Sequence, residues 1–144
     1  MEHVAIMKKS WGLLPKLVSG QKTIESRWLV NQSGPWGKVR EGETIYFKDA
    51  GEPVTVKATV SHVLELDNLG PGRVREILDF YGEDDGISDT EIPQYEALFS
   101  DKQYCVLIFM ENIQTIEPFH IDKQGFGAQT AWISVPSVHQ IKVV

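Results

Sequence analysis

Apolar and polar side chains alternate along the stretch Val54-Thr-Val-Lys-Ala-Thr-Val-Ser-His-Val-Leu-Glu-Leu66. A period of two is typical of a β-strand that buries one face. Only His62 and Val63 break the alternation, so we expect one long strand that is bent or bulged near them. His62 falls on the apolar face, where we expect a buried, hydrogen-bonded ring. The segment therefore predicts a sheet with one face in the core.

Further segments on both sides of this stretch are expected to be strands of the same sheet. Most follow one another directly or after short turns, such as the one at residues 49–53. The continuously apolar run 104–110 is typical of a strand that is buried on both faces. The expected strands are residues 4–7, 23–30, 43–48, 104–119 and 130–135, and residues 138–144 are expected to add an edge.

Three segments are expected to be helices. In the first, Ser10 is the expected N-cap and Gly20 the stop, with a proline early enough that the helix can begin a turn later. In residues 70–82, apolar positions recur at helical spacing. Residues 91–99 form the third helix, with a proline in its first turn.

The expected order of elements is β-α-β-β-β-α-α-β-β. Because most strands follow one another directly, we expect the α+β class: a small β-barrel of mixed or antiparallel strands with two or three helices at its periphery. A doubly wound parallel sheet would need regular alternation of strands and helices. Since the chain shows no internal repeat or low-complexity linker, we expect a single domain over residues 1–144.

The composition excludes several classes of protein. With 144 residues, 42% of them hydrophobic and 24% charged, the chain is close to globular averages and unlike disordered or fibrous proteins. No window reaches the ~18 apolar residues of a membrane span, and the N-terminus lacks a signal-peptide pattern. The single cysteine, Cys105, excludes an intramolecular disulfide and a zinc site built on several thiolates. We therefore expect a cytoplasmic protein with no membrane partner.

Charge is distributed unevenly along the chain. Residues 1–48 carry eight Lys and Arg against four Asp and Glu, whereas residues 49–104 carry four against thirteen. The net charge of −6 therefore hides a basic first third and an acidic middle. Since salt screens charges beyond about 10 Å, basic groups that converge locally can still bind an anion or a nucleic acid. An uneven solvated surface is the alternative interpretation.

The segment Gly20-Gln-Lys-Thr-Ile-Glu-Ser-Arg27 lies where the first helix is followed by a strand. Gly20 permits a left-handed backbone, so the chain can reverse tightly and present Lys22 at the turn. In an extended strand Glu25 and Arg27 share a face. The segment thus gathers an ammonium, a carboxylate and a guanidinium, either as a surface salt bridge or as a cleft that binds a ligand.

This segment resembles the signature of the ASCH domain, a member of the PUA-like barrel superfamily. The pattern is Gly20-x-Lys22-x-x-Glu25-x-Arg27, and the run Gly42-Glu43-x-Ile-x-Phe47 follows where that family enters its next strand. The apolar strand at 104–110 also falls near the family's late strand. The resemblance covers roughly residues 4–135.

The ASCH resemblance implies a β-barrel with a cleft that holds Lys22, Glu25 and Arg27 and binds RNA or a nucleotide-like small molecule. Some small bacterial ASCH proteins are similar to amidohydrolases that deacetylate acetylated cytidine with a Lys, a Thr and a Glu. Their signature has a threonine where this chain has Glu25. Thr23 is present one step away from that position and would face away from Glu25.

The alternative to a binding module is therefore an amidohydrolase that acts on acetylated cytidine or a similar modified nucleoside. In this hypothesis Lys22 is the catalytic nucleophile or base, because we expect burial beside Arg27 to lower the pKa of its amine. The catalytic acid is Glu25 or a residue of the acidic turn after the second helix. The sequence does not choose among the three acids of that turn: Glu83, Asp84 and Asp85.

Two tryptophans flank the loop at residues 31–37, close to the basic signature. Aromatic rings beside cations are what base stacking requires, at about 1–3 kcal/mol per base. We expect Trp28 to fill the core from its strand and Trp36 to be the better stacking residue. Further cations could extend the binding surface along a nucleic-acid backbone: Lys38, Arg40 and Lys48.

A glycine-rich segment precedes the last expected strand. Gly125 and Gly127 could let backbone N–H groups line the cleft, although a plain β-turn explains the same spacing. Lys123 is the charged residue of this segment that we expect to join the ligand-binding group.

No metal or cofactor is expected. The four histidines show no ligand-like spacing, and neither a phosphate loop nor a nucleophile elbow occurs. Cys105 lies in the most apolar strand and is expected to be inert core. A third hypothesis is a protein-interaction adaptor that uses the acidic residues 83–101. The oligomeric state stays open.

Overall fold

The computed structural model describes residues 1–70 and 72–143. Within these ranges the strands are β1 (Glu2–Met7), β2 (Ile24–Leu29), β3 (Thr44–Asp49), β4 (Val54–Leu66), β5 (Tyr104–Phe119) and β6 (Trp132–Val135). The helices are α1 (Leu13–Ser19), α2 (Arg73–Tyr81) and α3 (Ile92–Leu98), with short 3-10 turns η1 (Lys9–Trp11) and η2 (Val138–Gln140). None of the helices described is long and apolar enough to cross a membrane.

The strands form one curled sheet in the order β2-β5-β4-β3-β1-β6. β1 and β3 are parallel, and the other neighbouring pairs are antiparallel. This mixed sheet, with helices at its periphery, confirms the expected α+β barrel. β2 and β6 are the two ends of the strand order, so the barrel stays open between them. We call this gap the β2–β6 opening.

The alternating stretch forms β4 over all thirteen residues. Val54, Val56, Ala58 and Val60 are buried and alternate with half-buried polar residues. The pairing with β5 shifts register between Val60 and His62, which confirms the expected bulge. The shift turns His62 outward, where its side chain is 53% exposed and lies beside Glu41. The expectation of a buried His62 was therefore wrong, because the bulge ends the alternation one residue earlier.

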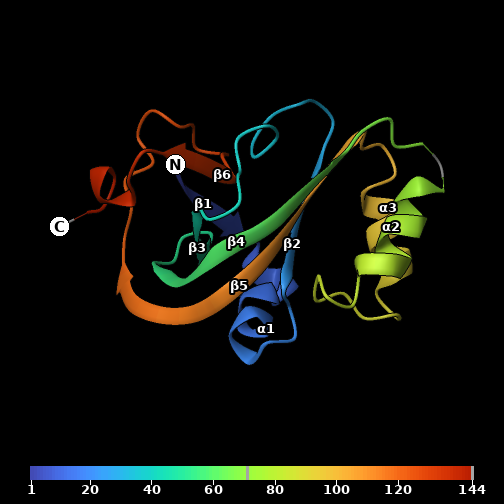
Figure 1. Cartoon of the computed structure of the whole chain (residues 1–144), viewed down its shortest axis with the longest axis horizontal. Helices are drawn as coiled ribbons and strands as arrows, with labels where there is room; N and C mark the ends of the chain where they lie inside the picture. Colours follow the sequence, from blue (N-terminus) through green and yellow to red (C-terminus); the bar gives the residue numbers. More distant parts are fainter. Residues whose placement is uncertain (71, 144) are drawn as a thin grey trace.

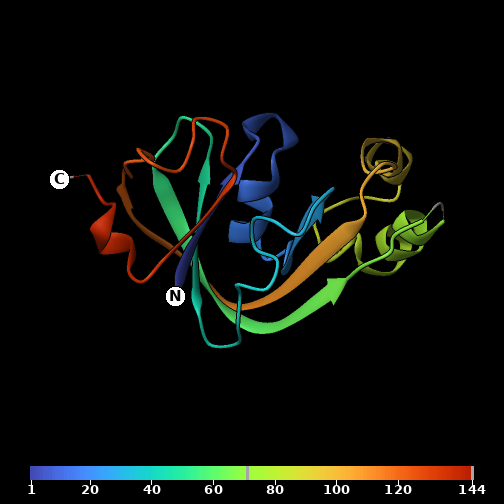
Figure 2. The ribbon, with the colours of Figure 1, turned by 90° about the horizontal axis from the view of Figure 1, so that it is seen from above.

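β4 and β5 run from the barrel to the two helices α2 and α3, as Figures 1 and 2 show. One core fills the barrel, with Ile45, Phe47 and Ile108 at its centre. A second core lies where α2 and α3 pack on β2 and the far part of β5, around Leu78, Tyr95 and Leu107. A third cluster lies around Val4, Ile133 and Val138. The long strand pair therefore connects the packed region of the barrel with that of α2 and α3.

The ends of the chain differ from the sequence-based expectation. Ser10 is not an N-cap: it lies inside η1, and α1 begins at Leu13 after Gly12. The expected edge strand at 138–144 is instead the turn η2 with an isolated bridge between Ile121 and Lys142. Two residues included in the expected elements, Pro71 and Val144, lie outside the described residues.

Candidate functional site: a buried charge cluster beneath an aromatic pocket

The turn after α1 directs Lys22 into the protein. Gly20 ends the helix in a left-handed conformation, with φ of 84°, and the Lys22 N–H then donates to the Lys16 carbonyl over 3.0 Å. The side chain of Lys22 is completely buried, whereas Thr23 beside it is exposed. The tight reversal predicted from Gly20 is present, and it places the amine inside the protein.

The Lys22 ammonium uses all of its donors inside the protein. Nζ donates to the Ile24 carbonyl over 2.7 Å, and to the carbonyl and Oδ1 of Asp85 over 2.8 and 2.5 Å. Glu25 Oε1 lies 3.3 Å away. Asp85 is thus the acid of the turn that reaches Lys22, while Glu83 and Asp84 are exposed.

The charges of this cluster set the protonation of Lys22. Burial alone would lower the pKa of its amine, but the carboxylates of Asp85 and Glu25 outweigh this and hold the pKa above its ordinary value. The expected lowering of the Lys22 pKa was therefore wrong. It assumed that Arg27 would be the dominant neighbour, whereas two carboxylates lie closer to the amine.

The two carboxyl groups differ in their pKa. Burial raises the pKa of Glu25, but Lys22 and Arg27 outweigh it, so that the net pKa is lowered. Burial also raises the pKa of Asp85; Lys22 opposes this, and the Glu25 carboxylate adds to it, so that its net pKa is raised. The cluster of Lys22, Glu25, Arg27 and Asp85 thus contains two basic and two acidic groups, and the two acids differ in how readily they ionise.

Arg27 connects the two sides of the β2–β6 opening. Its Nη2 lies 3.1 Å from Glu25 Oε2, as expected for residues that share a strand face. Nη1 donates to the Ala131 carbonyl over 3.1 Å, and the guanidinium lies over the Trp132 ring at 5.3 Å. Since its side chain is 15% exposed, Arg27 is the member of the cluster that solvent reaches most easily.

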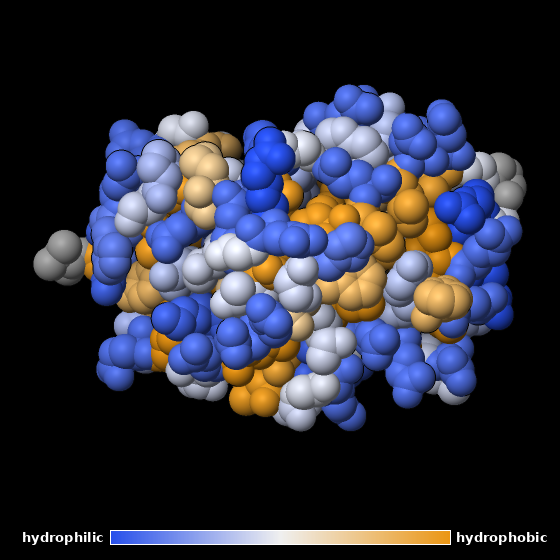
Figure 3. All heavy atoms as spheres, viewed as in Figure 1, coloured by the Kyte–Doolittle hydropathy of each residue, from blue (hydrophilic) through white to orange (hydrophobic). Residues whose placement is uncertain are grey.

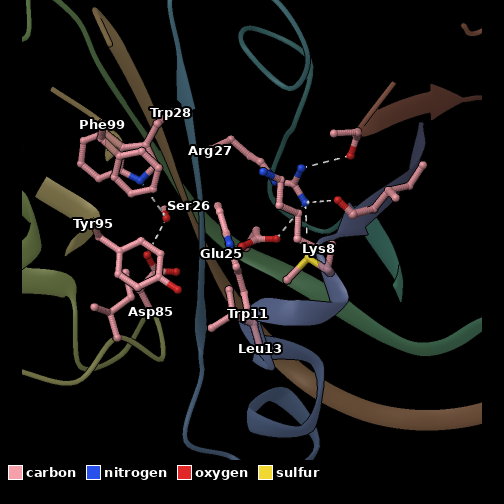
Figure 4. A pocket seen from close by; sticks show the side chains of 14 residues that line it. Lys8, Trp11, Leu13, Glu25, Ser26, Arg27, Trp28, Asp85, Tyr95 and Phe99 are labelled. Carbon is pink, nitrogen blue, oxygen red and sulfur yellow. Dashed lines mark hydrogen bonds and ion pairs between the residues drawn. The ribbon is translucent and has the colours of Figure 1, made fainter. Parts of the chain in front are cut away.

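An aromatic pocket of about 200 Å³ opens beside this cluster. Its walls come from β1, η1, β2 and the segment from α2 to α3, and its aromatic lining residues are Trp11, Trp28, Tyr95 and Phe99. Trp28 stacks on Phe99 with centroids 4.6 Å apart. Figure 4 shows the rings of Trp28, Tyr95 and Phe99 on one side of Ser26, and Glu25 and Arg27 on the other.

Polar groups also line the aromatic pocket. They include Glu25, Arg27 and Asp85. Ser26 donates from Oγ to Asp85 Oδ2 and accepts from Trp28 Nε1. Lys22 is not among the lining residues, since its side chain is completely buried. The face drawn in Figure 3 shows apolar surface gathered between the sheet and the two helices, with hydrophilic side chains around it.

Three residues expected to bind the ligand do not line the aromatic pocket. Trp36 packs edge-to-face on Tyr104, with centroids 5.0 Å apart, because its loop folds back onto the sheet. Lys48 is buried on β3, and burial together with the neighbouring Lys123 lowers its pKa. Lys123 lies close to Lys48 and 3.4 Å from the Ala128 carbonyl. The ligand-binding roles of these three residues stay predictions.

Sequence reasoning missed several lining residues. Trp11, Tyr95 and Phe99 fall within segments expected to be helices, with no ligand role assigned to them; they pack in or against the second core and also line the pocket. Ser26 stands inside the signature, on the strand face opposite Glu25, and it still lines the pocket. No spacing rule connects residues 95 and 99 to the signature, because the α2–α3 segment reaches the pocket through its tertiary packing.

Comparisons with known proteins bear on the fold of the chain. No protein-family model and no curated protein matches the chain. Among solved structures, the ASCH protein of Zymomonas mobilis is 18% identical, with a TM-score of 0.67 over 93% of this chain and 87% of that chain. A serine-to-alanine variant of the same protein gives a TM-score of 0.69 over 96% and 91%.

A third solved structure with similar coverage is the N-terminal domain of McrB from Staphylothermus marinus. It is 13% identical and gives a TM-score of 0.59 over 96% of this chain and 93% of that chain. The mixed barrel, the position of the signature at the α1–β2 junction and the likeness to the Zymomonas protein agree with one another. The chain therefore has the fold of an ASCH domain protein.

Proposed function

We propose that the protein binds a nucleobase in the aromatic pocket, as part of RNA or of a nucleotide-like small molecule. The observation that carries the proposal is the pairing of flat aromatic walls with hydrogen-bonding groups inside one small cavity. At about 200 Å³, the pocket is smaller than the ~300–1,000 Å³ of sites for drug-sized ligands. A single flat ring system suits this space.

The polar groups match the edge of a base. The carboxylates of Glu25 and Asp85 can accept from an exocyclic amino group, and Arg27 can donate to a ring nitrogen or carbonyl. The hydroxyl of Tyr95, which also lines the pocket, makes no hydrogen bond within the described residues and is available to a ligand. Stacking on aromatic walls contributes about 1–3 kcal/mol per base.

Titration with nucleosides tests this proposal. Adenosine, guanosine, cytidine and uridine are each added while tryptophan fluorescence is recorded, since Trp11 and Trp28 line the pocket. We expect at least one nucleoside to change the emission saturably. Glu25→Gln removes a charged acceptor without changing its shape and should weaken that binding about tenfold.

Glu117→Gln is the matched control, because Glu117 is exposed on β5 away from the pocket. Arg27→Lys is a second variant that keeps the charge near Glu25 but removes the guanidinium fork. Circular dichroism checks that each variant is folded. Affinity that stays unchanged in both pocket variants, or no binding of any nucleoside, would remove the pocket from the proposal.

Hydrolysis of an acylated nucleoside is the second candidate, and one observation favours it. Two carboxyl groups with pKa values shifted in opposite directions line the same pocket, which suits an acid–base pair. We place Lys22 outside this reaction, because its amine is buried and donates to three acceptors. In this hypothesis a water molecule attacks the acyl carbon and Glu25 takes its proton, while Asp85, whose raised pKa favours the protonated form, protonates the leaving amine.

Incubation with acetylated cytidine separates the two candidates. The hydrolase predicts release of acetate that is lost in Asp85→Asn, whereas a binding module shows saturable binding with no release. The adaptor hypothesis stays a prediction. Part of its acidic segment serves internal contacts: Asp85 holds Lys22, and Glu91 accepts from the Ser88 N–H and hydroxyl.

A further inference from the structure

A second hollow, of about 560 Å³, lies on the other side of Arg27. It is lined by β2 and β6 and by the glycine-rich loop before β6, and it shares Arg27 and Ala131 with the aromatic pocket. Both spaces therefore lie along the β2–β6 opening, with one guanidinium between them. We call this second space the cationic hollow.

The charge of the lining changes from one space to the other. The aromatic pocket includes the carboxylates Glu25 and Asp85, whereas the charged lining of the cationic hollow, within the described residues, consists of Arg27 and Lys38. Because the two spaces share lining residues, one ligand that occupies both would feel the charges of both linings with little screening by salt. A ligand that occupies both spaces should therefore carry hydrogen-bond donors at one end and negative charge at the other.

Arg27 has donors left for such a ligand. Its hydrogen bonds use Nη1 and Nη2, and its Nε–H makes none within residues 1–70 and 72–143. The acceptors are Glu25, Ile6, Met7 and Ala131. The guanidinium carbon of Arg27 lies 5.3 Å from the centroid of the Trp132 ring, in a cation–π contact. An arginine that is fixed on one side and free on the other is suited to hold a phosphate oxygen.

The glycine-rich loop adds neutral donors and an aromatic ring to the cationic hollow. Gly125 lines it with φ of 91°, and its N–H makes no backbone hydrogen bond in the part of the chain that the structure describes. Phe126 beside it is 37% exposed. Backbone N–H groups in such turns bind anions, and an exposed ring can stack on a sugar or a following base.

We infer that the cationic hollow binds the phosphate group of the nucleotide whose base occupies the aromatic pocket, with Arg27 between the two sites and Lys38 as the second cation. The inference rests on the proposed function and narrows its ligand class from a base or nucleoside to a phosphorylated nucleotide. A nucleoside monophosphate and an RNA strand both present this chemistry.

Calorimetric titrations with matched ligands test the inference. The probes are the four nucleosides, their 3′- and 5′-monophosphates, inorganic phosphate and a single-stranded RNA hexanucleotide. We expect at least one monophosphate to bind about tenfold more tightly than its nucleoside, as one added charge-assisted contact provides. This ratio should fall towards one in Lys38→Ala and keep its value in Lys57→Ala, which removes the same charge from β4.

The outcomes separate the inference from the function on which it rests. Nucleoside binding with no gain from phosphate, or a gain that persists in Lys38→Ala, overturns the phosphate site and leaves the base pocket intact. No binding of any nucleoside or nucleotide overturns both. If the hexanucleotide binds more tightly than the monophosphates and its binding depends on Lys38, the ligand is an RNA strand. If a monophosphate binds more tightly than the hexanucleotide, the ligand is a free nucleotide.

Discussion

Lys22 shows how a single buried side chain can hold distant parts of the chain together. Its ammonium joins the α1–β2 turn to Asp85, which lies in the loop between α2 and α3. Burying an ion is costly, and the cost is offset only where partners surround it. Here two carboxylates and two carbonyls do so.

Replacing Lys22 should therefore destabilise the fold before it reveals anything about binding. Lys22→Met leaves two carboxylates without their shared cation, and we expect a loss of about 3–5 kcal/mol in the free energy of unfolding. Urea denaturation measures this loss. The control Lys57→Met, at a half-buried position on the polar face of β4, should stay within about 0.5 kcal/mol of the parent. Equal stability of the two variants would show that the buried cluster contributes little.

The ionisation of Glu25 makes the free energy of unfolding depend on pH. Because its folded-state pKa lies below its ordinary value of 4.5, the unfolded chain binds a proton that the folded chain does not. Its contribution is fully present above that ordinary pKa and is lost as pH falls through the lowered one. We expect urea midpoints measured from about pH 5 to pH 3 to fall less steeply in Glu25→Gln than in the parent; an identical slope contradicts the assignment.

The sequence predicted part of this cluster. Glu25 and Arg27 meet because residues two apart on a strand share a face, and Lys22 joins them because Gly20 allows the turn. Asp85 could not be chosen from its two acidic neighbours, since only the fold shows which of three adjacent side chains points inward. The predicted direction of the Lys22 pKa shift was wrong for the same reason, because that direction depends on the carboxylate of Asp85.

At the scale of elements, the loop from α2 to α3 is the part that completes the site. Gly86, directly after Asp85, has φ of 84°, and a Cβ there would lie 3.3 Å from both Lys16 Cδ and Lys22 Cβ. The backbone therefore passes close to the buried lysine, which keeps Asp85 within reach of the ammonium.

Gly86→Ala tests this close approach. A left-handed backbone costs a non-glycine residue about 1–2 kcal/mol, and the contact with Lys22 adds to that cost. Gly51→Ala is the matched control, because Gly51 has φ of 79° with nothing within 4 Å of its Cβ. We expect Gly86→Ala to lower the melting temperature more than Gly51→Ala. If the two losses are equal, the packing around Gly86 is looser than described.

The elements themselves were largely readable from sequence. Strict alternation placed β4, and a continuous apolar run placed β5, since these patterns follow from burial of one face or of both. The ends were less predictable. Ser10 has a suitable side chain for a cap, but Gly12 adopts the left-handed conformation that separates η1 from α1, so the α-helix begins after it.

At the scale of the whole molecule, two packed regions share the aromatic pocket. One wall comes from the barrel through β1 and β2, and the other from the α2–α3 segment through Ile87, Tyr95 and Phe99. The helices are short, with seven residues in α3, and short helices depend on tertiary packing for their stability.

Hydrogen exchange should therefore distinguish the two regions. We expect amides of α2 and α3 to exchange faster than those of β4 at Val56 and Val60, where the strand lies between two neighbours. Addition of the tightest-binding nucleotide should slow exchange in α3 in particular, because Tyr95 lines the pocket. Slowing confined to the barrel would place the ligand elsewhere.

The long strand pair of β4 and β5 is bent by a bulge. β5 is bulged around Asn112, whose φ is 52°, where its pairing with β4 shifts register between Lys57 and Thr59. That bend lies outside the residues that line either ligand space. Because a β-branched residue disfavours the left-handed backbone of Asn112, we expect Asn112→Val to disturb the course of the strand pair without altering the lining of either space.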